Sequence, residues 1–145
     1  MKREVPSLLL RVLDANLNRA REGLRVCEEV ARLVLEEPRL TRRCQQIRYD
    51  LSRLSQRLSP AQLLKGSPLL KARDARRDVG RPAVRGRITA HRGIRDLVRA
   101  NSQRVQEALR VLEEFTRLRS SSIAKAFSAL RFRVYSVEQD LLSKL

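Results

Sequence analysis

The sequence predicts an all-α protein in which two pseudo-repeated helical hairpins form a helical bundle, joined by a long loop with short helical pieces. Its 145 residues suffice for one compact domain. Aromatic residues make up only 3%, with five Gly and five Pro, so an aliphatic core of helices is favoured over a sheet sandwich. We expect one helical domain over 1–145, with a first repeat at about 7–58, a connecting segment at 59–92 and a second repeat at about 93–144.

An internal repeat is the strongest pattern in the chain. Residues 15–33 and 100–118 share the pattern A-N-x-x-R-x-x-E-x-L-R-V-x-E-E-x-x-R-L at an offset of 85, with 11 identities in 19 positions. An Arg- and Leu-rich composition would give about two identities by chance. The repeat therefore indicates a duplication, and its apolar spacing predicts one long helix in each half.

A second helix is expected after each repeated motif. Two sets of apolar residues step by 4-3-4-3-4 at an offset of 83, namely Leu40, Cys44, Ile47, Leu51, Leu54 and Leu58, then Ile123, Phe127, Leu130, Val134, Val137 and Leu141. This is the apolar face of a helix. Pro38 separates the first pair of helices, and Ser120 begins a run of possible N-caps for the last helix. Two such hairpins suffice for a four-helix bundle.

The connecting segment differs in character from both repeats. It is interrupted by Gly and Pro, with one short helix predicted at 60–65. Its centre, residues 71–80, concentrates opposite charges beside a turn glycine. A connection of this length is usually functional or disordered, and a plain solvated loop would have a similar composition.

The net charge of +16, from 32 basic and 16 acidic residues, is typical of a nucleic-acid binder, of a site for a phosphate ligand, or simply of an arginine-rich proteome. Nucleic acid is disfavoured, because the arginines alternate with glutamates and no aromatic-rich strands offer stacking platforms. No apolar run approaches the roughly 18 residues that span a bilayer, and no signal-peptide pattern opens the chain. We therefore expect a soluble cytoplasmic protein that does not bind a membrane.

The inventory of reactive residues excludes several classes of enzyme. The single histidine and two isolated cysteines, Cys27 and Cys44, cannot form a zinc site, and we expect both cysteines to be buried. No P-loop, dinucleotide fingerprint, nucleophile elbow or H-E-x-x-H motif occurs. An enzyme with these residues would depend on arginines and on carboxylate–metal contacts, and phosphoryl transfer tolerates such a set best.

Each repeat places polar residues at the edge of its apolar face. At 100° per residue, Asn16 lies among apolar positions, with Arg19 and Glu22 along one edge. The second repeat places three residues in the same way, Asn101, Arg104 and Glu107. These residues either fix helix register through interhelical hydrogen bonds and i,i+3 pairs, or form two walls of a phosphate-binding cleft.

Other charged residues of the two motifs are expected on or near the outer face, in a solvated or intersubunit surface. They are Arg25, Glu28, Arg32, Arg110, Glu113 and Arg117. This surface alone cannot set an oligomeric state, so a homo-oligomer stays open.

The motifs together resemble a known family over nearly the whole chain. The matching residues are Asp14-Ala15-Asn16-x-x-Arg19-x-x-Glu22-Gly23-Leu24-Arg25-Val26-x-Glu28-Glu29, Ala72-Arg73-Asp74, Asp78-Val79-Gly80, Asn101-x-x-Arg104-x-x-Glu107-Ala108-Leu109-Arg110-Val111-Leu112-Glu113-Glu114 and Leu130-Arg131-Phe132. They resemble the hydroxymethylpyrimidine-phosphate kinase family of thiamine biosynthesis, a helical domain also found in front of some thiamine-phosphate synthases. The family usually has Arg-Tyr where this chain has Arg131-Phe132.

The resemblance implies an ATP-dependent phosphotransferase. It would transfer the γ-phosphoryl group of ATP to 4-amino-5-hydroxymethyl-2-methylpyrimidine phosphate and give the pyrophosphate, with Mg²⁺ as cofactor. Because the acceptor phosphate is already ionised, such an enzyme needs no strong general base. A thiamine-phosphate synthase is an implied partner, and a non-catalytic nucleic-acid-binding or scaffold domain is the alternative.

Roles for individual residues follow as hypotheses. We expect Arg19, Arg104 and Arg73 to act as catalytic residues that bind the phosphate oxygens and the charge developing between them. Asp74 and Asp78 are the expected Mg²⁺ ligands, because Mg²⁺ usually takes one or two carboxylates.

The remaining predicted residues bind or position substrate. Glu22 and Glu107 would orient the arginines, with metal contact as a second possibility, while the amides of the two asparagines would contact the aminopyrimidine edge. Gly80 would allow close backbone approach to phosphate. The complete set is Asn16, Asn101, Glu22, Glu107, Gly80, Arg48 and Arg131.

Overall fold

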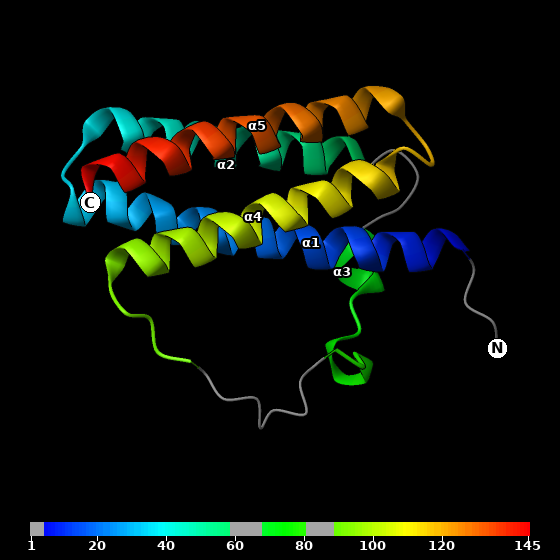
Figure 1. Ribbon diagram of the computed structural model, residues 1–145. Coiled ribbons are helices and arrows are strands. Elements are labelled where there is room, and N and C mark those ends of the chain that lie inside the picture. Colours follow the sequence, from blue (N-terminus) through cyan, green and yellow to red (C-terminus); the bar gives the residue numbers. More distant parts are fainter. Residues whose placement is uncertain (1–4, 59–67, 81–88) are drawn as a thin grey trace.

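The computed structural model describes residues 5–58, 68–80 and 89–145. In these residues the chain forms long helices and no strand, which confirms the predicted all-α fold. The long helices are α1 (Val5–Glu29), α2 (Pro38–Leu58), α4 (Ile94–Thr116) and α5 (Ser121–Lys144). Figure 1 shows α1 beside α4 in one layer and α2 beside α5 in the other, and each helix runs antiparallel to its neighbours.

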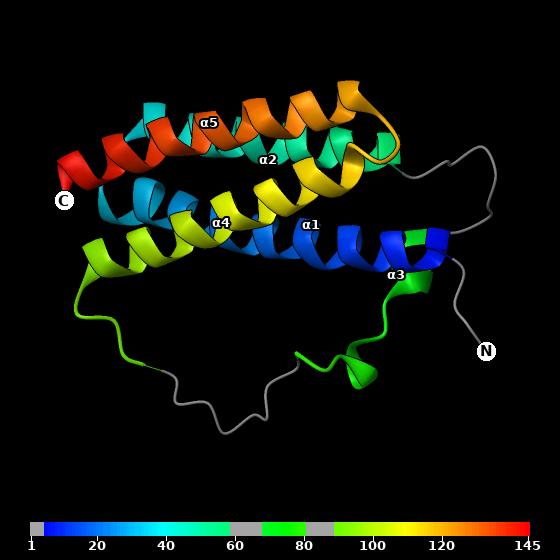
Figure 2. The ribbon, with the colours of Figure 1, turned by 45° about the vertical axis from the view of Figure 1, so that its right-hand side comes forward.

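Short helical pieces occur after α1 and in the connecting segment. A π-helical turn, η1 (Val30–Val34), extends α1, and the chain then reverses at Glu36, which has a positive φ of 49°. In the connecting segment, α3 (Pro68–Ala72) packs against α1, and a 3₁₀ turn, η2 (Ala75–Arg77), follows it (Figure 2). The short helix predicted at 60–65 lies outside the described residues.

The apolar faces that were predicted meet in one core. Ten of the twelve spaced residues of α2 and α5 are buried, and the two at one end of the bundle, Leu58 and Ile123, are half-buried. Cys27 and Cys44 are free and buried, as expected. Full burial of an aliphatic side chain contributes about 1.5–3 kcal/mol, so this core is the main source of stability. No helix within the described ranges is long and apolar enough to cross a membrane.

The helices α1 and α4 approach each other closely at Gly23. A Cβ atom at this position would lie 2.6 Å from Val105 Cγ2 and 2.9 Å from the carbonyl oxygen of Asn101. Further along the same contact, Cys27 Sγ lies 3.5 Å from Ser102 Oγ. The corresponding residue of the second repeat is Ala108, so only one half of the duplication requires glycine here.

Candidate functional site

The polar residues of the two repeats meet along one side of the α1–α4 contact, which we call the α1/α4 edge (Asn16, Arg19, Glu22, Asn101, Arg104 and Glu107). Arg104 Nη2 lies 3.2 Å from Glu22 Oε2, and both side chains are more than half exposed. The offset of 85 relates this pair to Glu107 and Arg19, which are therefore opposite each other in the antiparallel register. The edge thus carries two guanidiniums and two carboxylates, one of each from each repeat.

The two asparagines bond within their own helices. Asn16 Nδ2 donates to the Val12 carbonyl at 2.9 Å, and Asn101 Nδ2 donates to the Leu97 carbonyl at 2.9 Å. Asn16 Oδ1 accepts a long hydrogen bond of 3.4 Å from Arg19 Nη1. Among the residues that the structure describes, neither amide makes the interhelical hydrogen bond of the structural alternative, and each Nδ2 instead donates to a carbonyl four residues back along its own helix.

A second cluster joins the connecting segment to α1. Arg73 donates from Nε to Asp14 Oδ2 at 2.7 Å and from Nη2 to Asp14 Oδ1 at 2.9 Å. Arg11 Nη2 donates to the carbonyl oxygen of Asp74 at 3.1 Å, and Leu69 of α3 is buried nearby in sequence. These hydrogen bonds to Asp14 raise the pKa of the Arg73 guanidinium above its ordinary value. The two hydrogen bonds between Arg73 and Asp14 therefore hold residues 69–74 against α1.

Arg21 completes this Asp14–Arg73 cluster. Its Nη2 donates to Ser55 Oγ of α2 at 2.9 Å. Burial lowers the pKa of Arg21, the charge of Asp14 raises it and the charge of Arg73 lowers it further, with a net decrease. Arg21 and Arg73 therefore flank the same buried carboxylate.

The structure separates two groups that the sequence analysis assigned to one cleft. Asp14 and Arg19 are five residues apart, so their side chains leave α1 about 140° from each other. Arg73 consequently meets Asp14 on one flank of the helix, while Arg19 lies on the flank that faces α4. Asp14 was not among the predicted site residues, although it is the first residue of the first motif. Its equivalent in the second motif is Arg99.

The predicted metal ligands lie in the turn after α3. Asp78 Oδ1 accepts the backbone N–H of Gly80 at 2.9 Å, and both residues are exposed. Asp74 is half-buried. No group of three or more His, Cys, Asp or Glu residues among the described positions could hold a metal ion. One or two carboxylates are nevertheless the set that Mg²⁺ takes when phosphate and water supply the other ligands, so these two residues remain a prediction.

Two acidic residues predicted on the outer face are instead buried, at 1% exposure for Glu28 and 3% for Glu113. The expectation was wrong because the flank of α1 that turns away from α4 packs against α2, and the same holds for α4 and α5. Arg48 of α2 bonds Glu28, with Nε 2.5 Å from Oε2. Arg131 of α5 bonds Glu113 Oε2 from Nη2 at 2.9 Å and from Nε at 3.2 Å. The duplication has thus preserved one buried ion pair in each hairpin.

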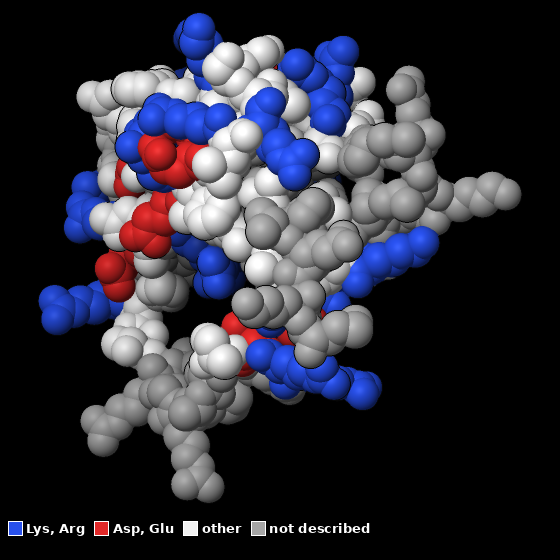
Figure 3. All heavy atoms as spheres, turned by 90° about the vertical axis from the view of Figure 1, so that its right-hand side faces the viewer, with Lys and Arg blue, Asp and Glu red and all other residues white. Residues whose placement is uncertain are grey.

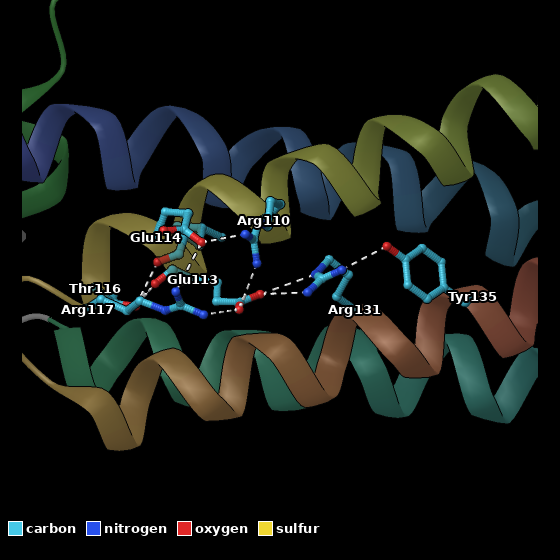
Figure 4. A network of polar contacts seen from close by, with 8 residues as sticks. Arg110, Glu113, Glu114, Thr116, Arg117, Arg131 and Tyr135 are labelled. Atoms are coloured by element: carbon cyan, nitrogen blue, oxygen red, sulfur yellow. Dashed lines mark hydrogen bonds and ion pairs between the residues drawn. The ribbon is translucent and has the colours of Figure 1, made fainter.

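Figure 4 shows the network around Glu113. Its Oε1 accepts from Arg110 Nη1 at 3.0 Å and from Arg117 Nη2 at 2.9 Å, while Arg131 Nη1 donates to the Tyr135 hydroxyl at 2.9 Å. Burial raises the pKa of Glu113, but the hydrogen bonds from Arg131 and the three nearby guanidinium charges lower it more. The pKa therefore falls below its ordinary value, and Glu113 is held ionised. Arg131, predicted to bind substrate, is committed here to a buried carboxylate.

A largely apolar pocket of about 290 Å³ lies at the end of the bundle where α1 and α5 begin. Its lining includes the side chains of Leu9, Leu13 and Leu58, together with Arg57 and Arg119. On the face shown in Figure 3, which views the molecule from this side, basic side chains are spread out and interspersed with acidic ones. The distribution agrees with the alternating charges of the sequence.

Curated relatives match along almost the entire chain. A thiamine-phosphate synthase of Synechocystis sp. is 42% identical over 146 residues, covering 100% of this chain and 40% of the relative. A thiamine-phosphate synthase of Nostoc punctiforme is 37% identical over 97% of this chain and 37% of its own length, and one of Rhodopirellula baltica is 36% identical over 94% and 35%. The chain therefore spans about two fifths of the length of these relatives. No solved structure matches it.

These relatives correct the function that the resemblance implied. They are named for the synthesis of thiamine phosphate and not for transfer of a phosphoryl group from ATP, so the assignment as a hydroxymethylpyrimidine-phosphate kinase is wrong. The alternative of a nucleic-acid-binding or scaffold domain fits these names no better. Thiamine biosynthesis, the coarser part of the prediction, is supported. The family model described as "ThiD2 family" matches residues 11–140, and the chain belongs to that family.

Proposed function

We propose that this chain is a phosphate-binding helical module of thiamine biosynthesis, which holds a pyrimidine phosphate and works with a thiamine-phosphate synthase in the cytoplasm. The proposal rests on one observation, which is that the full chain matches about two fifths of a protein named thiamine-phosphate synthase. The product in that name is a phosphate ester. The excess of 16 positive charges favours such an anionic ligand.

The α1/α4 edge is the proposed phosphate site. Among the described residues, Arg19 makes one hydrogen bond, a long one of 3.4 Å to Asn16, and Arg104 pairs with an exposed glutamate at 3.2 Å. An exposed ion pair of this kind is worth about 0–1 kcal/mol, so both guanidiniums can turn to a ligand at small cost. Guanidinium groups bind phosphate through two parallel hydrogen bonds, and two of them would hold both faces of one phosphate group.

The carboxylates of the α1/α4 edge make phosphate binding depend on a cation. Glu22 and Glu107 balance the two arginines, so a phosphate dianion would leave the site with excess negative charge. A divalent cation removes that excess, and Mg²⁺ with oxygen ligands from carboxylates and phosphate is the cation that we propose. Glu22 and Glu107 would supply its protein ligands, because the hydrogen bonds of Arg73 to Asp14 hold the segment of Asp74 and Asp78 on another flank of α1.

The asparagines favour an amine-bearing ring. At Asn101 one N–H of Nδ2 donates to a backbone carbonyl, which leaves the second N–H and the acceptor Oδ1 available. An acceptor at this position selects a ligand with an N–H group at its edge, as an aminopyrimidine has.

Calorimetric titration tests the proposal, with the pyrimidine monophosphate as ligand and the unphosphorylated alcohol as its control. We expect saturable binding of the phosphate that requires Mg²⁺, and at least ten-fold weaker binding in Arg19→Ala and in Arg104→Ala, because a charged hydrogen bond contributes about 1.5–3 kcal/mol. Arg99→Ala removes an exposed arginine of α4 outside the edge and is the matched control.

A second measurement connects the module to its pathway. The rate of thiamine phosphate formation by a separately supplied thiamine-phosphate synthase should rise when the chain is added, and Arg104→Ala should reduce that rise. Equal affinity for the phosphate and the alcohol, or unchanged affinity in both edge variants, would refute the proposed site.

A further inference from the structure

A groove rich in arginine lies on the other layer of the bundle, between α2 and α5. It has a volume of about 490 Å³, in the range of small-molecule sites. Residues of both helices line it, and we call them the α2/α5 groove, namely Arg39, Arg42, Arg43, Gln46, Ile47, Arg133, Ser136 and Val137. Because α2 and α5 form the layer opposite α1 and α4, this groove is separate from the α1/α4 edge (Figure 1).

Two of its four arginines are held in place by carboxylates. Arg43 Nη1 pairs with Asp140, and Arg43 Nη2 donates to Ser136 Oγ at 2.8 Å. Arg133 Nη1 lies 2.7 Å from Asp50 Oδ2. These ion pairs join α2 to α5 and fix the two guanidiniums along the groove, which reduces the entropy that a ligand would otherwise lose by ordering them.

The other two arginines have no such partner. Arg39 and Arg42 are exposed, and their side chains make no hydrogen bond or ion pair with another described residue. The nearest acidic side chain in sequence to Arg39, Glu37, is itself paired with Lys144 at 3.3 Å. Two of the four positive charges are thus balanced by Asp50 and Asp140, and two remain, which matches one dianion.

The groove also has an apolar floor and a free donor. Ile47 and Val137 line its floor and are almost completely covered, so the methylene stems of the surrounding arginines supply the remaining apolar wall that a ligand can contact. The hydroxyl of Ser136 accepts from Arg43 and can still donate its own hydrogen to a ligand. A phosphate group joined to a compact apolar or aromatic body satisfies both features.

The second repeat lacks this combination. At the offset of 83, positions 39, 42, 43 and 46 correspond to Ser122, Lys125, Ala126 and Ala129. The core positions of α2 and α5 are shared between the repeats, but the arginines of the groove are not. The groove is therefore a feature of the first half of α2 and is not a consequence of the duplicated packing.

We propose that the α2/α5 groove is a second anion site, which binds a small phosphate monoester through Arg39, Arg42 and the two fixed arginines. It is independent of the α1/α4 edge, so either site can fail without the other. The ester body packs on the methylene stems and guanidinium planes of the groove arginines, and the phosphate group replaces solvent between the guanidiniums.

Titration calorimetry with phenyl phosphate tests this site, with inorganic phosphate as a second probe. We expect one saturable site that binds phenyl phosphate more tightly than inorganic phosphate, and at least ten-fold weaker binding in the double variant Arg39→Gln/Arg42→Gln. The double variant Arg95→Gln/Arg99→Gln removes two exposed arginines of α4 and should bind like the parent. Arg19→Ala should also leave this binding unchanged, which separates the two sites.

Three results would overturn the proposal. The first is no saturable binding of either probe at millimolar concentration. The second is equal weakening in the groove and control variants, which would indicate a general effect of net charge. The third is binding of a random-sequence duplex, steeply dependent on salt and lost in the groove variant, without binding of phenyl phosphate, which would assign the groove to nucleic acid instead.

Discussion

The buried carboxylate of Glu113 should be far more important for stability than its exposed neighbour. Glu113 and Glu114 both pair with Arg110 and Arg117, at 3.0 and 2.9 Å for Glu113 and at 2.7 and 3.4 Å for Glu114. They differ in environment, because the side chain of Glu113 is 4% exposed and that of Glu114 is 42% exposed. Glu113→Ala and Glu114→Ala are therefore a matched pair of substitutions.

The expected magnitudes follow from this difference. Removing one partner of a buried ion pair costs about 3–5 kcal/mol, because the remaining charge is left without compensation. Arg131 is 14% exposed and would lose its partner, whereas Arg110 and Arg117 can turn to water, so we expect the low end, about 3 kcal/mol. Glu114→Ala breaks ion pairs with Arg110 and Arg117, two side chains that are more than half exposed and can turn to water, and should cost about 0–1 kcal/mol.

Urea denaturation followed by far-ultraviolet circular dichroism measures both values. For a chain of this length, the entropy of unfolding is about 0.3 kcal/mol per kelvin, so Glu113→Ala should also lower the melting temperature by about 10 °C. Equal losses in the two variants, or a loss below about 1 kcal/mol for Glu113→Ala, would refute the view that burial determines the contribution of this network.

Three further predictions concern protonation, packing and thiol reactivity. The folded pKa of Glu113 lies below its unfolded value, so its contribution to stability is present above about pH 4.3 and is lost as the pH falls through the folded pKa. When melting is measured from pH 7 to pH 3, the stability advantage of the parent over Glu113→Gln should therefore shrink in that acidic window. Gly23→Ala should destabilise by about 1–3 kcal/mol in urea, because the new methyl group would lie 2.6 Å from Val105 Cγ2, and a gain in stability from helix propensity would contradict the close approach. Burial raises the pKa of Cys44 to about 12, so a thiol reagent at pH 8 should leave it unmodified until urea unfolds the chain, and rapid modification of the folded protein would contradict this packing.

The periodicity of apolar residues predicted the helices that repeat. The burial of the charged residues depends on contacts between helices, which this periodicity does not show. The spacing of Ile47, Leu51 and Phe127 identified the core faces of α2 and α5, because apolar burial has a helical period. The burial of Glu28 could not be predicted from the sequence, because a helical wheel shows the apolar face that meets one neighbouring helix but not the flank that meets a second helix. Its partner Arg48 lies 20 residues away on another helix.

The Asp14–Arg73 pair illustrates the same limit for the candidate site. Its members are separated by 59 residues, and Arg73 lies in the segment that has no repeat. Neither propensity nor spacing relates two such positions, so the sequence analysis placed Arg73 with Arg19 on resemblance alone. The α1/α4 edge, in contrast, could be predicted, because its residues occupy equivalent places in two helices related by duplication.

The single attachment of the connecting segment has a consequence for how such a protein could arise. In an assembly of two identical hairpins, the two symmetry-equivalent positions would carry the same residue. Either both would be acidic and could bind Arg73, or neither would. Here Asp14 binds the guanidinium of Arg73, while its counterpart in the second repeat, Arg99, has the opposite charge and could not bind a guanidinium. Because both copies lie in one chain, each half can carry a different residue at this position, and the connecting segment can dock on the first half alone.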